Sequence, residues 1–310
     1  MTSAPVAASA AVLKDGRRRR PHGRLTAIVA ILPFALFIAF FAAFPLIEVF
    51  RLSISRTSIV DGAFVSALSG ADNYVRVLAD PRAWNSLRVT LVFIVAAVVG
   101  TIILGLILAL LVNRSVWLLG VARNILIWPA VIAPVVVSLM WLLLFSPTVG
   151  GVNKVFRTLG IGQQQWLNTE TGALVVAILV DVWHWTPVVF LFLYTALQAI
   201  SHDIIEAARI DGADERQILR HVILPLLTPA IAAAALIRLV QSVKAFDEIF
   251  LLTKGGPNDA TMLASLHIRN MFFDRLDFGY AAALSIIVVL TVLVAVALYT
   301  IARRRVRGKS

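Results

Sequence analysis

The feature that most constrains this chain is a series of long apolar runs. A helix needs roughly 20 apolar residues to cross the ~30 Å hydrocarbon core of a bilayer, where lipid offers no hydrogen-bond partner to the backbone. Barrel strands are shorter, about 10 residues, and alternate in polarity, so runs of this length exclude them. We therefore predict six membrane-spanning helices, at about residues 25–50, 89–112, 125–145, 173–199, 229–252 and 280–302.

Composition supports an all-α membrane protein. Hydrophobic residues make up 60% of the 310 and charged residues 15%, whereas soluble domains are roughly half apolar and a quarter charged. The net charge of +11 comes mostly from Lys and Arg just outside the apolar runs, which favours a role in membrane orientation over nucleic-acid binding. The absence of cysteine excludes disulfides, thiolate metal sites and a catalytic thiol.

The basic segments indicate the domain organisation and the orientation. We interpret residues 1–24, which include a run of four arginines, as a disordered basic cytoplasmic tail. Residues 25–302 form the predicted six-span domain, and 303–310 a second basic cytoplasmic tail. Lys and Arg are enriched on the cytoplasmic side of spans, so both termini are predicted to lie inside. The first apolar run is too long for a signal peptide and is interpreted as an uncleaved span.

A loop at 200–228, between the fourth and fifth runs, is too polar to cross the membrane. Ser201 is predicted to cap a short helix, which should end at Asp211-Gly212 because glycine readily adopts a positive φ. A second helical stretch is predicted from Ala213 to Ile223, ending before Pro225. Two short helices with a bend between them suit a groove on a partner protein.

This loop resembles the EAA loop of ABC importer permeases, whose pattern is E-A-A-x3-G-x9-I-x-L-P. Six of its seven fixed positions match, and Val222 stands where the pattern has Ile. In that family the loop is the coupling helix that docks on the ATPase subunit; an ordinary loop helix is the alternative interpretation. The resemblance implies an ATPase-coupling role for Glu206, Ala207, Ala208, Asp211, Gly212, Leu224 and Pro225.

Stretches outside this loop resemble the carbohydrate-uptake branch of these permeases, the maltose and glycerol-phosphate type. They are Gly70 with Asn73-Tyr74, Asp80-Pro81 and Trp84; Trp141 with Gly151 and Asn153; and Thr253-Lys254-Gly255-Gly256-Pro257, where Lys254 replaces a glycine of the T-G-G-G-P signature. The likeness covers the chain from about residue 25. It implies the six-span type I ABC importer permease fold and a sugar, polyol or glycerol-phosphate-like solute.

The resemblance also implies how transport is powered and which partners take part. Alternating access would be driven by a dimer of ATP-binding subunits, with a second permease subunit completing a heterodimer and an extracytoplasmic solute-binding protein delivering the carbohydrate. The setting is a bacterial cytoplasmic (inner) membrane. The chain has no Walker A sequence, so ATP and Mg are expected on the ATPase. We expect neither a cofactor nor a catalytic residue in this chain.

Polar residues inside the apolar runs are candidates for the substrate path, because charge at membrane depth is costly. Arg238, Gln241 and Ser242 are three and four residues apart and share a helix face; the resemblance places Arg238 and Ser242 at positions that line the sugar site of maltose-type relatives. The substrate-path candidates are Arg238, Gln241, Ser242, Lys244, Asp181, Trp183 and Trp185.

Structural roles compete with this interpretation. Lys244 could pair with Asp247, or Arg238 with a carboxylate of a partner subunit, and Asp181 could pair with His184, three residues away. The tryptophans suit subunit interfaces as well as sugars. No cluster of metal ligands surrounds His184, so no metal site is predicted.

Two other protein classes are weaker alternatives. A secondary transporter of a small polar solute usually shows repeated halves with interrupted helices, and no internal repeat is visible. Ion coupling would also leave the 206–225 pattern unexplained, as would a membrane scaffold that transports nothing.

Overall fold

The computed structural model of the chain describes residues 24–60, 63–113, 120 and 125–307, and they are mainly helical. The chain divides into two compact units, Met1–Glu48 and Val49–Ser310. Most of the N-terminal tail, 1–23, and the last three residues lie outside the described residues. The backbone expected to leave the last span at 303 stays helical through Arg307.

The first unit is an apolar helix with a π turn inside it. It comprises α1 (Arg24–Ile38), the π turn η1 (Ala39–Ala43) and the start of α2 (Phe44–Ser53), which continues into the second unit. The π turn directly precedes Phe44-Pro45. Proline has no N–H to donate and its ring crowds the preceding turn, and a wider turn relieves this crowding.

The second unit is built on three packed helices. α4 (Pro81–Asn113) packs along α9 (Glu170–Gln198), and α12 (Leu224–Val243) packs against both. Their contacts bury Phe93, Ala97, Val180 and Phe190. The remaining helices are α3 (Asp72–Ala79), α6 (Trp128–Val131), α7 (Pro134–Leu144), α8 (Gly151–Thr158), η2 (Trp166–Asn168), α10 (His202–Ile210), α11 (Glu215–Ile218), η3 (Leu219–Ile223), α13 (Asp247–Leu252), α14 (Ala264–Arg269), η4 (Asn270–Asp274) and α15 (Phe278–Arg307).

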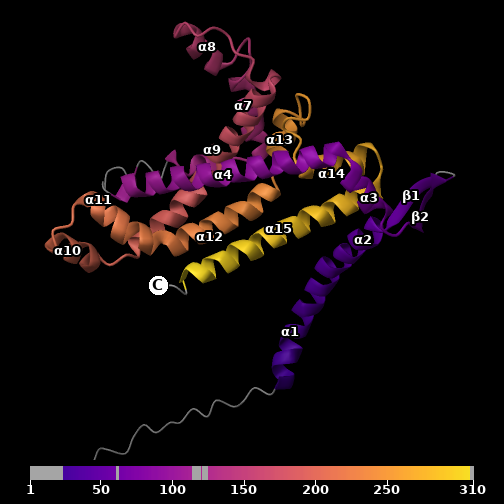
Figure 1. Cartoon of the computed structure of the whole chain (residues 1–310), viewed down its shortest axis with the longest axis horizontal. Helices are drawn as coiled ribbons and strands as arrows, with labels where there is room; N and C mark the ends of the chain where they lie inside the picture. The colour runs from indigo at the N-terminus through magenta and orange to yellow at the C-terminus, as the bar shows by residue number, and fades with distance from the viewer. Residues whose placement is uncertain (1–23, 61–62, 114–119, 121–124, 308–310) are drawn as a thin grey trace, which may run out of the picture. The chain divides into compact units, whose positions relative to one another are not determined.

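The polar loops of this unit gather at two opposite ends. α10 and α11 lie at one end of α4 and α12, and α3 and α14 lie at the other (Figure 1). The loop at 200–228 is therefore separated by the length of a span from the segments that carry the Asn73-Tyr74 and Asp80-Pro81 sequences.

A β-hairpin follows α2 and was not anticipated from the sequence. β1 (Ser55–Val60) pairs antiparallel with β2 (Ala63–Leu68), with Thr57 opposite Ser66 and Ser58 opposite Val65. The two hydroxyls of the Thr57–Ser66 pair hydrogen-bond at 3.0 Å. The segment contains several β-branched residues, which favour strands, but it is short and flanked by helices.

The third predicted span is not one helix. The run at 125–145 forms α6 and α7, separated by Ile132 and Ala133 in extended conformation. Pro134 causes this break, because a proline disfavours helical geometry in the residue before it.

The fifth predicted span, 229–252, is wrong at both ends. The second helical stretch of the loop does not end before Pro225 but runs on into the span, so that α11, η3 and α12 form one continuous helix over Glu215–Val243. In η3 the N–H of Leu224 bonds to the carbonyl of Leu219, and this π turn accommodates Pro225 as η1 accommodates Pro45. At the other end the helix stops at Val243, and α13 is a separate helix.

Five helices among the described residues are long and apolar enough to cross a membrane. The α6–α7 pair occupies the remaining predicted run, the third, with α7 a shorter apolar helix. The five helices span Ile28–Ser53, Pro81–Asn113, Glu170–Gln198, Glu215–Val243 and Phe278–Ala297.

The orientation of these helices can be tested with reporter fusions. Because Lys and Arg concentrate on the cytoplasmic side, fusions after Leu68 and Asn258 should report the outer face, and a fusion after Gly212 the cytoplasm. Alkaline phosphatase and a fluorescent protein fused at the same sites give opposite readouts and control for expression. A cytoplasmic signal at Asn258 would contradict the predicted orientation.

Candidate functional site

A buried ion pair joins α9 to α12 at the centre of the second unit. Arg238 is only 1% exposed, and its Nη2 donates to Oδ2 of Asp181, which is equally buried. Nε of Arg238 donates to Thr101 Oγ1 of α4 at 3.3 Å. The guanidinium carbon lies 5.4 Å from the centre of the Trp185 ring, within the range of a cation–π contact. Arg238 thus links all three packed helices.

A second pair joins α9 to α13. Nδ1 of His184 hydrogen-bonds to Oε1 of Glu248, and both side chains are almost fully buried. Asp181 and His184 are one helical turn apart, so the two pairs lie side by side along α9. They connect α9 to both sides of the break between α12 and α13.

A polar cavity of about 220 Å³ opens beside these pairs. Four of the seven substrate-path candidates line it: Asp181, Trp185, Gln241 and Lys244. Glu248 and Asp247 complete its charged wall. Arg238 and Ser242 are fully buried and stand behind this wall. The Nη1 of Arg238, the Oε1 of Gln241 and the Oγ of Ser242 are buried without a hydrogen-bond partner among the described residues.

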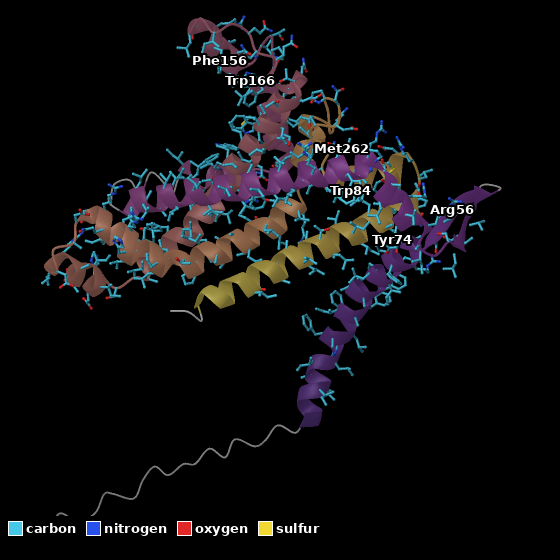
Figure 2. The ribbon with its side chains drawn as sticks, in the orientation of Figure 1. Arg56, Tyr74, Trp84, Phe156, Trp166 and Met262 are labelled. Atoms are coloured by element: carbon cyan, nitrogen blue, oxygen red, sulfur yellow. The ribbon has the colours of Figure 1, made fainter. Side chains whose placement is uncertain are left out.

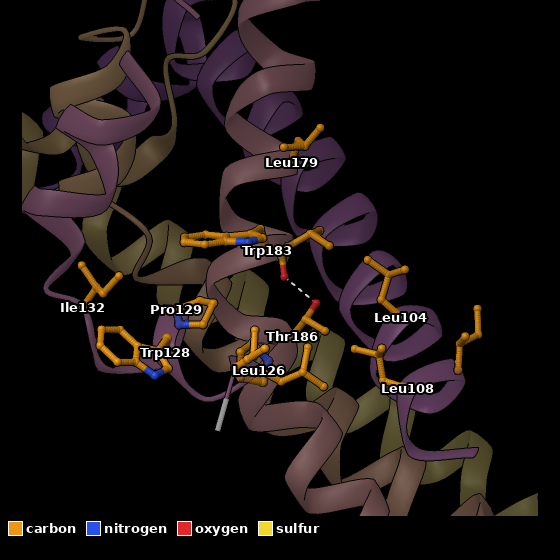
Figure 3. Close-up of a pocket in the computed structure, with 13 residues that line it drawn as sticks. Leu104, Leu108, Leu126, Trp128, Pro129, Ile132, Leu179, Trp183 and Thr186 are labelled. Carbon is orange, nitrogen blue, oxygen red and sulfur yellow. Dashed lines mark hydrogen bonds between the residues drawn. The ribbon is translucent and has the colours of Figure 1, made fainter. Parts of the chain in front are cut away.

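Trp183 lies elsewhere. It lines a separate apolar pocket of about 730 Å³ between α4, α6 and α9, beside Trp128, Pro129 and Leu179 (Figure 3). The hydroxyl of Thr186 in this pocket is already bonded to the Val182 carbonyl at 2.5 Å. The pocket offers aliphatic and aromatic surface, so it does not share the polar chemistry of the cavity.

The structure also places the competing pairs. Asp181 contacts Arg238 and not His184, and the partner of Arg238 lies in the same chain. Lys244 and Asp247 are exposed and form no ion pair within the described part of the chain. Sequence reasoning left out Thr101 and gave Glu248 no partner, since both contacts depend on packing between distant segments. Among the described residues, no group of three or more His, Asp or Glu could hold a metal ion.

The loop at 200–228 forms the predicted bend. The Ser201 hydroxyl caps α10 by accepting from the Asp203 N–H at 3.3 Å. Gly212 has a φ of 82°, which glycine adopts without the penalty that a Cβ brings. The sequence also carries a capping box that was missed: Asp214 accepts from the Gln217 N–H at 2.7 Å, and the Gln217 side chain accepts from the Asp214 N–H at 2.8 Å.

The surface of this loop is open. Glu206 and Gly212 are exposed, and Ile210 is 86% exposed at the end of α10. A hollow of about 370 Å³ lies at the bend, lined by residues that include Gly212, Gln217 and Val222. Exposed apolar side chains such as Ile204 and Ile210, on a loop too polar for lipid, are typical of a protein interaction surface.

Comparison with known proteins identifies the family. Residues 101–308 match the sequence model of the binding-protein-dependent transport system inner membrane component. The chain belongs to this permease family.

The similarity to relatives of known family extends over most of each chain. The chain is 36% identical to a probable ABC transporter permease protein, y4oQ, of Sinorhizobium fredii, over 89% of each chain. It is 35% identical to the trehalose/maltose transport system permease protein MalF of Thermococcus litoralis, over 85% of this chain and 88% of that one. A solved bacterial ABC transporter for the acidic polysaccharide alginate matches with a TM-score of 0.79 at 21% identity, covering 91% of this chain and 96% of that one. The fold is thus that of type I ABC importer permeases.

Family-like motif residues of the permease hold its loops together. The buried Asn73 donates to the Ser53 and Ser55 carbonyls at 3.0 and 2.8 Å. Tyr74 shares a 2.8 Å hydrogen bond with the Ser53 hydroxyl, and it lies beside the junction of α2 and α3 in Figure 2. Gly279 lies against Asn73, where any Cβ would clash. The Asn-Tyr pair therefore fastens α2 and β1 to the start of α15.

The motif residues Asp80 and Asn153 also hold neighbouring segments together by hydrogen bonds. Asp80 accepts from the Arg82 N–H at 2.8 Å, which caps α4 at Pro81, and from the Tyr280 hydroxyl at 2.6 Å. Burial acts to raise the pKa of Asp80, but these hydrogen bonds hold it below its ordinary value. The nearby hydrogen bond to Asp277, at 2.5 Å, raises the pKa of Arg76. Asn153 bonds to the Ser146 carbonyl and to both backbone groups of Gln164. Asn73, Tyr74, Asp80 and Asn153 therefore stabilise the loops in which they lie.

Breaking the buried pair should destabilise the permease. Arg238→Met leaves the Asp181 carboxylate buried without its partner, at a cost of about 3–5 kcal/mol, so less folded protein should be recovered. The double variant Arg238→Met with Asp181→Leu removes both charges and should recover much of the loss. Fluorescence-detected size-exclusion chromatography after heating measures this, with the exposed Arg157→Met as control. Recovery of Arg238→Met equal to that of the unmodified chain would contradict a structural pair.

Proposed function

We propose that the chain is the transmembrane subunit of an ATP-driven importer of a carbohydrate delivered by an extracytoplasmic binding protein. The observation that carries this proposal is the similarity, over 70–93% of this chain, to permeases named for trehalose/maltose, multiple sugar, trehalose and lactose transport. Family membership supports a partner ATPase, which would hold ATP and Mg, and a second permease subunit. Both termini would lie in the cytoplasm of a bacterial cell.

In this proposal the loop at 200–228 docks on the ATPase subunit. Its exposed surface lies at the end of the helices opposite to α3 and α14 (Figure 1). The docking surface is α10, which contains Glu206, Ala207 and Ala208. Ile210 supplies an exposed apolar contact, and Gly212 sets the angle between α10 and α11. Asp211 ends α10, and Leu224-Pro225 directly follow the π turn inside the continuous helix.

The path of the motion follows from the continuous helix. α11, η3 and α12 form one helix from Glu215 to Val243, so a displacement at the ATPase end moves Arg238 and Gln241 at its other end. The buried pairs carry this motion to α9 and α13. The polar cavity beside Gln241 then changes its access from one side of the membrane to the other, and the second permease would close its open face.

The coupling role predicts a specific loss of activity. Gly212→Val forces a side chain into a φ of 82° and should bend the loop out of its docked shape, abolishing sugar uptake and sugar-stimulated ATP hydrolysis. Ile210→Glu places a charge in the docking surface and should lower the amount of ATPase that co-purifies. Gly160→Val is the matched control, because Gly160 has a φ of 75°, equally open surroundings and a position in another loop.

These measurements use complexes in proteoliposomes, scored per assembled complex. Normal uptake by Gly212→Val at normal expression would contradict the coupling role. Uptake that persists without ATP and follows an ion gradient would favour the secondary transporter instead.

The cavity predicts a graded effect on substrate handling. A hydrogen bond to a sugar hydroxyl contributes about 0.5–1.5 kcal/mol, so Gln241→Ala should raise the apparent uptake constant roughly two- to tenfold without loss of assembly. Gln198→Ala, at the far end of α9, is the control. An unchanged uptake constant for Gln241→Ala would remove α12 from the solute site.

A further inference from the structure

We infer that the polar cavity between α9, α12 and α13 selects an uncharged polyhydroxylated solute and disfavours solutes that carry a phosphate, carboxylate or sulfonate. This inference rests on the proposed function, since it specifies the solute class of the same site. Family membership leaves the question open, because a solved relative imports an acidic polysaccharide. The buried Arg238 raises the same question from the other side, as an arginine in a span could serve an anionic solute.

The first argument is charge. The charged groups that face the cavity or stand directly behind it are two cations, Arg238 and Lys244, and three carboxylates, Asp181, Asp247 and Glu248. His184, on α9, adds a positive charge only when its imidazole is protonated. The cavity therefore has no surplus of positive charge with which to hold an anion.

The position of Arg238 strengthens this point. Its Nη2 is bonded to Asp181, its Nε to Thr101, and its plane lies over Trp185. An anion that competed for Arg238 would have to displace the buried Asp181 carboxylate, which would then lose its partner inside the protein. Arg238 thus serves the cavity as a neutralised hydrogen-bond donor and not as a free positive charge.

The second argument is hydrogen bonding. The unpartnered buried atoms are a donor, Nη1 of Arg238; an acceptor, Oε1 of Gln241; and Oγ of Ser242, which can do both. Of these three residues Gln241 lines the cavity, and a solute hydroxyl can donate a hydrogen bond to its side-chain oxygen. Ionised phosphate, carboxylate and sulfonate oxygens only accept, and they would meet the Gln241 oxygen and the Asp181 and Glu248 carboxylates without a proton to offer. Trp185 adds an aromatic ring to the wall, which suits the C–H faces of a sugar ring.

The test uses the assembled complex in detergent without the binding protein, because the binding protein makes its own selection. Direct binding is measured by isothermal titration calorimetry with trehalose, maltose, lactose, glycerol 3-phosphate and digalacturonate. At least one neutral sugar should bind at least tenfold more tightly than either anion.

Variants of cavity charge sharpen the test. Asp247→Lys reverses the charge of an exposed cavity residue outside both buried pairs. It should lower the ratio of the binding constant of the neutral sugar to that of the anion at least threefold. Glu170→Lys makes the same change of charge outside the cavity and should leave the preference unchanged.

The possible outcomes separate the two levels of the proposal. Tighter binding of the anions than of every neutral sugar would overturn the inference while leaving carbohydrate import in place. No binding of any of the five compounds, by a complex that assembles and hydrolyses ATP, would contradict both the inference and the proposed function. An equal shift of preference in Asp247→Lys and Glu170→Lys would show that the cavity's charge does not determine selection.

Discussion

Inside the hydrocarbon core each backbone N–H and C=O has to find a hydrogen-bond partner within the protein. Proline has no N–H to donate, and the rest of this structure depends on how the helices accommodate their prolines. Before Pro45 and Pro225 the helix widens into a π turn and continues. Before Pro134 it breaks, and α6 and α7 separate. The π turn keeps the helix continuous, whereas the break at Pro134 divides the segment into two short helices. The chain therefore has one continuous helix from the loop at 200–228 past Arg238, and an irregular third apolar segment.

Charge at membrane depth is the second constraint. The chain neutralises Arg238 with Asp181 and brings His184 to Glu248, so that α9 holds α12 and α13 on either side of the break at 244–246. Such pairs contribute little net stability compared with apolar packing, yet breaking one is strongly destabilising. They therefore fix how the helices are connected.

The motif residues outside the loop at 200–228 connect the chain with the family through the sequence, and their contacts are visible only in the structure. Asn73, Asp80 and Asn153 occur where sugar permeases have the same residues, and the sequence could only connect them with the family. The structure shows that their side chains bond to the backbone of neighbouring segments. Lys254, in place of a signature glycine, has a φ of 52°, which explains why glycine suits that position.

The sequence by itself determined that long apolar helices cross the membrane, the Ser201 cap and the Gly212 bend of the loop at 200–228, and the family, because these depend on hydrophobic length, local hydrogen bonds and a fixed spacing. Tertiary structure decided the rest. Asp181 meets Arg238, 57 positions along the chain, through packing between helices that no local pattern records. Trp183 and Trp185 are two residues apart, which is about 200° around a helix, so one faces an apolar pocket and the other the polar cavity. Which face of α9 meets which neighbour is set by the packing of the whole unit.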